Sequence, residues 1–454
     1  MNDISKVRFE ALAAYCRQPY ALIMAEEVRW LEAYDEAMLV VVIRDVADDD
    51  YAAIVLARDL KERYRWVEMT SFFDTVDQAL AAALELVEHV HANFEKLRTQ
   101  DDEKGKPIDF FTPVVPTEKL NRDFAAITAF EGYSPAVELM KPMMRWYEDA
   151  DGNFVEQFQT TGFDTRLWEL YIFAMLVEAG YVIDRSAAIP DFQARSAFGE
   201  ICIEATTVNP SRDAKGQLIP TPPLDTEEQI THFRQEYMPI RFAGPLTTKL
   251  AKKYWDRPNV RGRPLLFAIQ DFHAPMSMLL SRSSLPIYLY GMRWDWHHDA
   301  NGKLIIIPSR VDFHCWGKKN VQSGFFNLPG AENVSAVIAN PSATISKFNR
   351  MGVVAHFGSK RVRLVREGTA VNLDPNSAEP LHFVHYVNES GYSETWMEGA
   401  DVFHNPRAKY PLDPGMLPGA AHHRLLESGQ MDSRVPPWQP FVSTTQIFIQ
   451  GGDG

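Results

Sequence analysis

Cysteine is scarce in this chain of 454 residues. The three that occur, Cys16, Cys202 and Cys315, lie far apart, so no two have the short spacing of a metal site or a redox motif. A disulfide framework and a zinc site of paired cysteines are therefore excluded. Scattered thiols are typical of a reducing compartment, and we expect a cytoplasmic protein.

Long hydrophobic runs are missing as well, although 46% of the residues are hydrophobic and 12% are aromatic. Charged residues interrupt every apolar stretch well before the roughly 18 residues that a membrane helix needs. The N-terminus, MNDISKVRFEALAAYCRQPY, lacks the basic start and apolar block of a secretory signal. No G-x-x-x-x-G-K-[ST] or G-x-S-x-G motif occurs, so P-loop and serine-hydrolase chemistry are not supported. We expect a folded soluble protein without a membrane partner.

Positive charge is in deficit, because 46 Lys and Arg residues stand against 60 Asp and Glu residues, giving a net charge of −14. This balance disfavours a general nucleic-acid binder, since phosphate contacts rely on Lys and Arg. Two segments are locally basic. The first contains Arg234, Arg241, Lys249, Lys252, Lys253, Arg257, Arg261 and Arg263. The second contains Lys347, Arg350, Lys360, Arg361, Arg363 and Arg366, which could contact a phosphate backbone or form a solvated face.

Residues 1–98 are predicted to form a small α+β domain. Apolar and charged positions alternate at helical spacing over residues 4–32, which predicts one or two helices. The acidic residues 48–50 lack the spaced ligands of a calcium loop and predict a solvated hairpin turn. Strands are predicted at 37–44, 51–56 and 65–70, with a helix over 75–94.

The rest of the chain divides into a linker, a core and an extension. Residues 99–118 are charged and proline-containing, as in a linker. Helices are predicted over 119–160, ending in a turn at 149–153, and the core extends to residue 285. Residues 286–454 are predicted to be a β-rich and loop-rich extension, which could belong to the same domain.

The stretch Phe163–Asn209 carries the most information about function. Residues 164–179 predict a buried helix, because the middle of this segment is apolar on every side and Glu169 is its early acid. The pair Pro190-Asp191 follows a short extended run. Residues 201–208 then alternate as a strand does, so Ile201, Ile203 and Ala205 share one face, and Glu200, Cys202, Glu204 and Thr206 share the other.

A helix, a loop and a strand therefore each deliver one carboxylate, from Glu169, Asp191 and Glu204. Magnesium takes a few such oxygens and keeps water ligands for substrate phosphate groups. It can then polarise a phosphodiester and generate hydroxide near neutral pH. Glu169 could instead pair with Arg166 or emerge at the helix end.

The order helix-Glu, Pro-Asp, Glu-x-x on an apolar strand, Lys-bearing helix and apolar strand PLLFAIQDF resembles the PD-(D/E)XK nuclease superfamily over about residues 160–275. The resemblance implies a restriction-endonuclease-like α/β core, with a mixed central sheet flanked by helices. It also implies that Asp191, Glu204 and the Ala205 carbonyl bind Mg²⁺ or Mn²⁺, and that Glu169 holds the metal through water.

The chain departs from the family pattern at Thr206, where the family has a lysine. In some members of such folds a neighbouring helix supplies the lysine, and Lys252 is the first choice here, with Lys249 and Lys253 behind it. The resemblance further implies DNA as the partner, with Lys249, Lys253, Arg257, Arg261 and Arg263 as contacts. A homodimer is left open as the assembly.

The histidines offer weaker alternatives. His297 and His298 are adjacent and cannot both face one metal from a strand. A second metal site built from them or from the later histidines, and an acid or base role for His273 after the predicted strand, are both open. The simpler interpretation is that these histidines are hydrogen-bonded residues of the surface or the core. The later histidines are His382, His385, His404, His422 and His423.

The sequence thus supports two principal hypotheses. The first is a metal-dependent nuclease that hydrolyses phosphodiester bonds in DNA. The second, motivated by Thr206 and the net acidity, is a catalytically inactive nuclease-like scaffold that binds nucleic acid or a protein. A hydrolase of another phosphate ester is the third.

Overall fold

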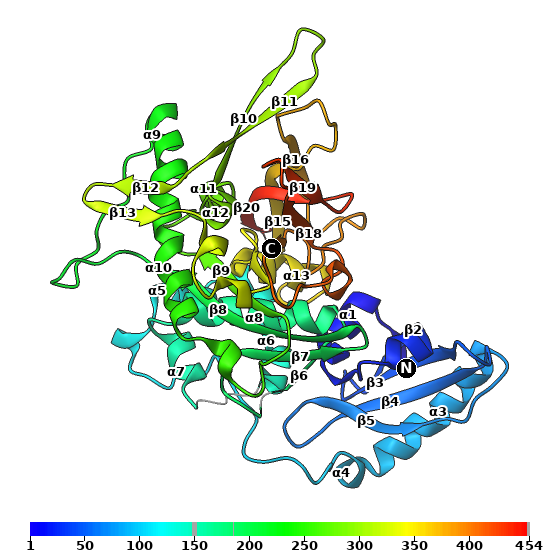
Figure 1. The fold of residues 1–454 in the computed structure, drawn as a ribbon. Helices are drawn as coiled ribbons and strands as arrows, with labels where there is room; N and C mark the ends of the chain where they lie inside the picture. Colours follow the sequence, from blue (N-terminus) through cyan, green and yellow to red (C-terminus); the bar gives the residue numbers. More distant parts are fainter. Residues whose placement is uncertain (148–151, 185, 452–454) are drawn as a thin grey trace.

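A computed structural model describes residues 1–147, 152–184 and 186–451 (Figure 1). Part of the turn predicted over residues 149–153 lies outside the described residues. Throughout these three ranges, no helix has both the length and the apolar character needed to cross a lipid bilayer.

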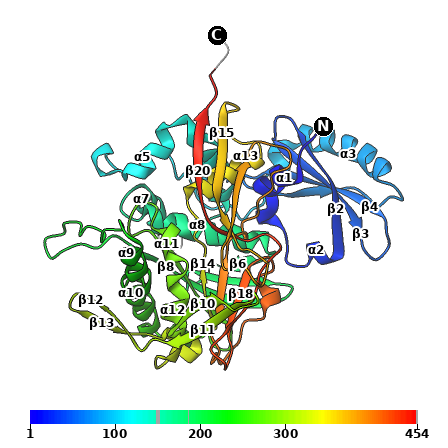
Figure 2. The same ribbon diagram turned by 90° about the horizontal axis from the view of Figure 1, so that it is seen from above.

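The N-terminal region is an antiparallel five-stranded sheet in the order β1-β2-β3-β4-β5. One helix, α3, covers one of its faces and buries Ala79, Ala83, Val87 and Val90 at helical spacing. Figure 2 shows this sheet to one side of the rest of the molecule. The elements are β1 (Asn2–Asp3), α1 (Lys6–Ala13), α2 (Ala21–Met24), β2 (Ala25–Ala33), β3 (Met38–Asp45), β4 (Tyr51–Arg58), β5 (Tyr64–Met69), α3 (Val76–Ala92) and α4 (Phe94–Leu97).

The prediction of one or two helices within residues 4–32 is correct for α1 and α2 and wrong for residues 25–32, which belong to β2. The sequence AEEVRWLEA contains good helix formers, so its local propensity favours a helix. Pairing with β3 along its length overrides that propensity. The three strands and the helix predicted after it are confirmed as β3, β4, β5 and α3.

The segment predicted as a linker is anchored in the core. Phe110 is completely buried, and its ring packs against those of Phe154 and Phe158. The Gln159 side chain donates hydrogen bonds to the Phe110 and Thr112 carbonyl oxygens. The helices that follow are α5 (Arg122–Ala129), α6 (Ser134–Trp146), α7 (Phe154–Gln159) and α8 (Phe163–Glu178).

The central sheet is mixed and has eight strands in the order β19-β18-β17-β14-β9-β8-β7-β6. β8 and β14 run parallel to β9, β17 runs parallel to β18, and the other neighbours are antiparallel. The strands are β6 (Val182–Asp184), β7 (Phe192–Ser196), β8 (Gly199–Val208), β9 (Leu265–Asp271), β14 (Ala336–Ala339), β17 (Asp401–His404), β18 (Ala421–Leu425) and β19 (Met431–Arg434). Half of this sheet therefore comes from the C-terminal third of the chain.

Helices cover both faces of the sheet, which confirms a mixed α/β architecture. On one face, Ile201, Ile203 and Ala205 of β8 pack with α6 and α8. On the other, Cys202 and Val208 pack with α10 and α12. The predicted alternation of β8 is thus confirmed, and Glu204 lies on the α10 side. The second set of helices is α9 (Glu227–His232), α10 (Met238–Ala251), α11 (Met278–Ser281) and α12 (Ser284–Tyr290).

The remaining C-terminal elements are two hairpins, a helix and a small sheet. The β10–β11 hairpin projects from the body of the molecule (Figure 1). The small antiparallel sheet has the order β16-β15-β20. These elements are β10 (Met292–His298), β11 (Leu304–Arg310), β12 (Phe313–Trp316), β13 (Lys319–Gln322), α13 (Ile345–Val354), β15 (Val362–Ala370), β16 (Leu381–Tyr386) and β20 (Pro440–Ile449).

Candidate functional site

Helix α8 places Glu169 in the protein interior. The helix is buried along nearly its whole length, and Gly180 after it adopts the left-handed conformation (φ 77°) that ends a helix. The Glu169 side chain is only 7% exposed, and its Oε2 accepts hydrogen bonds from Arg166 Nη1 (2.7 Å) and Tyr147 Oη (3.1 Å). The pairing with Arg166 considered from the sequence is therefore present.

Asp191 lies directly before β7, just past the point where β7 pairs with β8. The last pair between these strands at that end is Phe192 with Ile203, so the β8 backbone beyond Ile203 is free of β7. Asp191 Oδ2 accepts a hydrogen bond from the Ala205 backbone N–H (2.7 Å). The Asp191 side chain therefore occupies the place beside β8 where β7 would otherwise continue. It lies next to Glu204 and Ala205, the two β8 residues predicted as metal ligands.

Glu204 projects from β8 toward α10 and is 5% exposed. Its Oε1 contacts the Lys249 ammonium group and accepts a hydrogen bond from Tyr254 Oη (2.7 Å). Burial and this hydrogen bond raise the pKa of the Tyr254 hydroxyl, which therefore remains a donor at neutral pH. Half-buried Thr206 lies on the same face of β8.

The three predicted acids are close enough to influence one another electrostatically. Burial, then the charge of Glu204 and the charge of Glu169, raise the pKa of Asp191 to about 7. Lys249 and the Ala205 N–H act in the opposite direction. A carboxylate whose pKa is raised by burial and by neighbouring carboxylates is costly in its charged form, and a bound cation would stabilise that form.

The oxygens present fit a magnesium ion better than a metal that needs a full set of protein ligands. No group of three or more His, Cys, Asp or Glu side chains within the described residues is arranged to hold a metal ion. Magnesium usually takes one or two carboxylates and completes its shell with waters and substrate phosphate oxygens. Asp191 Oδ1 and Glu204 Oε2 accept no hydrogen bond from the described residues, and so remain available. Asp191, Glu204 and the Ala205 carbonyl are the residues that could supply such oxygens.

The preference for Lys252 over Lys249 has to be corrected. Helix α10 ends at Ala251, because Lys253 adopts a left-handed conformation (φ 50°) and the chain turns there. Lys252 keeps helical backbone angles as the C-cap of α10, but its side chain is exposed, as is that of Lys253. Lys249 is flanked by the buried residues Leu246 and Leu250 and reaches Glu204.

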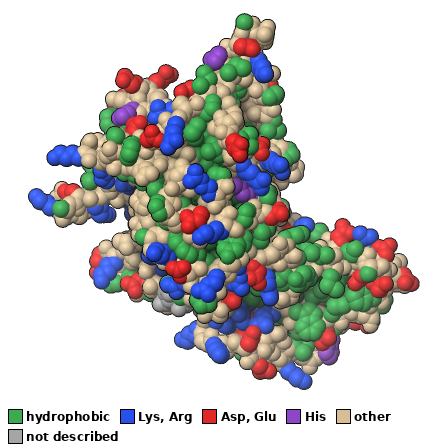
Figure 3. Space-filling view, in the orientation of Figure 1, with side chains coloured by type: hydrophobic (Ala, Val, Ile, Leu, Met, Phe, Trp, Pro, Cys, Tyr) green, Lys and Arg blue, Asp and Glu red, His purple; other side chains and the backbone are tan. Residues whose placement is uncertain are grey.

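The basic residues predicted to contact DNA divide into an exposed group and a group paired with carboxylates. Lys253, Arg257 and Arg261 are exposed. Lys249 is engaged by Glu204, and Arg263 Nε lies 2.7 Å from Glu200 Oε2. On the face drawn in Figure 3, basic and acidic side chains are interspersed. Only part of the predicted set is thus available to a phosphate backbone.

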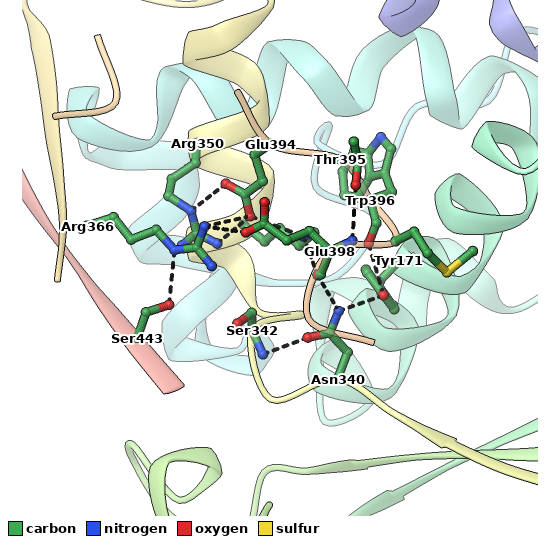
Figure 4. Close-up of polar contacts among 12 residues, drawn as sticks. Tyr171, Asn340, Ser342, Arg350, Arg366, Glu394, Thr395, Trp396, Glu398 and Ser443 are labelled. Atoms are coloured by element: carbon green, nitrogen blue, oxygen red, sulfur yellow. Dashed lines mark hydrogen bonds and ion pairs between the residues drawn. The ribbon is translucent and has the colours of Figure 1, made fainter. Parts of the chain in front are cut away.

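Half of the second basic segment is buried, so the interpretation of Lys347, Arg350 and Arg366 as a phosphate-binding or solvated surface is wrong, whereas Lys360, Arg361 and Arg363 are exposed. The side chains of Lys347, Arg350 and Arg366 are at most 2% exposed. They surround Glu394 and Glu398, as Figure 4 shows for the two arginines. Sequence reasoning missed this pairing because the carboxylates lie roughly 30 or more positions further along the chain.

The histidines do not form a metal centre in the described part of the chain. His404 Nε2 lies 2.9 Å from His422 Nδ1, and His423 Nε2 lies 3.1 Å from Asp401 Oδ1. His273 is buried, and its Nδ1 lies 2.8 Å from Asp271 Oδ1. These contacts describe hydrogen-bonded core histidines.

Two residues that contact the candidate site carried no clear signal in the sequence. Tyr254 follows the end of α10, and Tyr147 lies more than 20 positions before Glu169. Aromatic residues at such positions are usually core material, so only the fold shows that their hydroxyl groups reach carboxylates. Arg166 was recognisable from its i,i+3 spacing to Glu169.

No protein-family model matches this chain, and no curated protein sequence or solved structure matches it either.

The raised pKa of Asp191 predicts how stability depends on pH. The unfolded chain releases this proton near pH 3.8, whereas the folded protein holds it up to about pH 7. Stability from this group is therefore present at low pH and is lost as the pH rises across that window. We expect the metal-free protein to lose on the order of 2 kcal/mol of unfolding free energy between pH 5 and pH 8 from this group.

Urea denaturation at pH 5 and pH 8 measures that loss. Asp191→Asn is expected to remove it, and Asp184→Asn, at an exposed carboxylate on β6, is expected to retain it. Equal pH dependence in the wild type and in Asp191→Asn would contradict the assignment.

Proposed function

We propose that this protein is a Mg²⁺-dependent nuclease that hydrolyses phosphodiester bonds in DNA, with its active site at the β7–β8 edge and the adjoining end of α10. The observation that carries the proposal is the proximity of Asp191 and Glu204 next to Ala205, together with the contact between the Lys249 ammonium group and the Glu204 carboxylate. The resemblance to the PD-(D/E)XK nucleases, in sequence order and in the mixed sheet flanked by helices, supports it.

Each residue has a distinct role in this proposal. Asp191, Glu204 and the Ala205 carbonyl would hold the metal ion. When bound, magnesium would polarise the phosphodiester, lower the pKa of a bound water and neutralise the negative charge that develops in the transition state. Glu169, held by Arg166 and Tyr147, maintains the negative potential around Asp191.

Lys249 takes the role that the family assigns to the lysine at the Thr206 position. Its side chain comes from α10 and enters the same face of β8. The ammonium group has three donors, so it can contact Glu204 and still orient an attacking water. Tyr254 fixes the Glu204 carboxylate from the other side of the turn that ends the helix.

A nuclease-like scaffold without activity is the second candidate. Two of the three acids already have partners within the protein, which favours this candidate. Glu169 accepts hydrogen bonds from Arg166 and Tyr147. Glu204 Oε1 contacts Lys249 and accepts a hydrogen bond from Tyr254. The decisive experiment is incubation of the purified protein with supercoiled plasmid, with Mg²⁺, with Mn²⁺ and with a chelator. Metal-dependent nicking or linearisation supports the nuclease, and intact plasmid under all conditions supports the scaffold.

Lys249→Met is expected to lower metal-dependent cleavage by about 100-fold or more, because an oriented charge donor at a reacting centre is lost. Lys252→Met is the matched control, since this lysine is exposed three positions further along the chain. We expect it to cleave plasmid like the wild type. Initial cleavage rates at saturating Mg²⁺ compare the three proteins, and the reverse ranking of the two variants would refute the role of Lys249.

A further inference from the structure

A cavity of about 570 Å³ lies between the N-terminal region and the helices of the core. Helix α1, the short helix α2 and the turn after β3 form one side, and α6, α8, α13 and residues 393–396 form the other. Figure 2 shows α1 between the N-terminal sheet and α13. Small-molecule sites typically occupy roughly 300–1,000 Å³ and are common where two parts of a protein meet, so this cavity is a candidate binding site.

Apolar side chains line both sides of this cavity. Val7 and Ala11 come from α1 on one side. Leu139 of α6, Val177 of α8 and Trp396 come from the other. A ligand that fills the space between them has to have an apolar body, because burial of apolar surface is the main favourable contribution from such a wall.

Five acidic and two basic residues also belong to the wall that the structure describes. Two of the acids are neutralised by cations outside the cavity, since Glu26 pairs with Arg44. Glu394 pairs in the same way with Arg350 of the buried ion cluster. The seven charged residues of the wall are Lys6, Glu10, Arg17, Glu26, Glu27, Glu178 and Glu394.

The two basic residues, Lys6 and Arg17, do not balance the three acids that remain. Arg17 donates two hydrogen bonds of 2.7 Å to Glu27. Lys6 Nζ lies 3.8 Å from Glu10 Oε1, and Arg17 Nη1 lies 3.7 Å from the same oxygen, so both are too distant for a hydrogen bond to Glu10. One negative charge of the wall is therefore left over, and Glu178 is the acid without an ion-pair partner among the described residues.

Glu178 lies at the end of α8 and is accessible from the cavity. Its two oxygens accept hydrogen bonds from the backbone N–H groups of Trp396 (2.7 Å) and Met397 (2.8 Å), which fix the carboxylate in place. The surrounding residues displace enough water to raise the pKa of Glu178 to about 7, and the charge of Glu10 acts in the same direction. Ionisation of Glu178 is therefore costly, and a cation bound beside it would stabilise the charged form.

We propose that this cavity binds an organic cation that has an ammonium group and an aliphatic body. The ammonium group contacts Glu178 on the side that faces Glu10, and the aliphatic body packs against the apolar side chains of α1, α6 and α8. The surplus negative charge disfavours an anionic ligand, and a neutral ligand leaves Glu178 without a counter-charge. The proposal does not depend on the nuclease assignment, since none of these residues belongs to the candidate site at β7 and β8.

Titration calorimetry of the full chain at pH 8, without added metal, tests the proposal with three probes that share a six-carbon chain. Hexylammonium carries a positive charge, hexanol is neutral and hexanoate carries a negative charge. We expect saturable binding of hexylammonium with a dissociation constant of about 1 mM. Hexanol is expected to bind about tenfold more weakly because it cannot neutralise Glu178, and hexanoate is expected to show no binding.

Glu178→Gln is expected to weaken hexylammonium binding by about tenfold, so that the variant no longer distinguishes hexylammonium from hexanol. Glu10→Gln is a second variant and is expected to weaken the binding several-fold. Glu10 accepts no hydrogen bond from the described residues, so this variant keeps the test valid if Glu178→Gln fails to fold. Glu118→Gln is the matched control, because Glu118 is an exposed acid outside the cavity, and we expect it to bind like the wild type.

Circular dichroism establishes that each variant is folded. Absence of hexylammonium binding to the wild type would overturn the proposal. So would binding of hexanol or hexanoate as tight as that of hexylammonium, because the carboxylates would then not select the ligand. Hexylammonium binding that Glu178→Gln and Glu10→Gln both leave intact would also overturn it, since the amine would then bind elsewhere.

Discussion

Replacing Asp191 by asparagine is expected to lower Mg²⁺-dependent plasmid cleavage by at least about 100-fold. The substitution preserves the size of the side chain and its ability to accept the Ala205 N–H hydrogen bond. It removes one of the two carboxylates that would hold the metal, whose charge stabilisation contributes several kcal/mol to the transition state. The loss should therefore arise in the chemical step and not in the fold.

Asp184→Asn is the matched control for this experiment. Asp184 is an exposed carboxylate at the end of β6, in the same sheet as Asp191. We expect its variant to cleave like the wild type, and Glu204→Gln to behave like Asp191→Asn. Initial rates across a Mg²⁺ titration measure both effects, and undiminished cleavage by Asp191→Asn and Glu204→Gln would exclude the proposed site.

Replacing Glu394 by glutamine is expected to destabilise the fold by about 3–5 kcal/mol. Glu394 Oε2 lies 2.7 Å from Arg350 Nε, and Oε1 lies 3.1 Å from Lys347 Nζ. Burial alone would raise the pKa of Glu394, but Arg350, Arg366 and Lys347 together hold it well below its usual range. Loss of this charge leaves three buried cations with Glu398 as the other anion of the cluster.

Lys347→Met provides an informative comparison, because Glu394 retains Arg350 and Arg366 when Lys347 is removed. Burial also lowers the pKa of Lys347, which indicates that its charge is costly in this position. We therefore expect a smaller loss of unfolding free energy than in Glu394→Gln, and no loss in Glu389→Gln, at an exposed position. Urea denaturation measures all three, and equal effects of the Glu394 and Lys347 substitutions would contradict the account of the cluster.

Much of the fold could be predicted where local pattern and tertiary environment agree. The two-residue alternation of β8 and the continuous apolar character of β9 arise directly from their places in the sheet. Strand β2 could not be predicted, because its residues favour a helix and pairing with β3, and with β1 at one end, holds them extended. The contribution of β17, β18 and β19 to the central sheet was also hidden, since pairing between distant segments leaves no local trace.

The acidic residues of the candidate site could be predicted from the sequence, whereas the choice of its lysine could not. Glu169, Asp191 and Glu204 follow from the order of elements and from the period of β8. The choice among Lys249, Lys252 and Lys253 depended on which side chain reaches β8, and the contact between Lys249 and Glu204 decides that. The spacing of the lysines along the chain does not reveal such a contact between distant segments.

We predict above all that Asp191 and Glu204 bind a divalent metal ion. Titration of the folded protein with Mn²⁺ at neutral pH, followed by electron paramagnetic resonance of the free ion, measures this binding without reference to any substrate. We predict that the wild type binds Mn²⁺ and that Asp191→Asn combined with Glu204→Gln abolishes the binding, with both proteins folded by circular dichroism. Equal binding by the two proteins, or no binding by the wild type, would contradict the central claim.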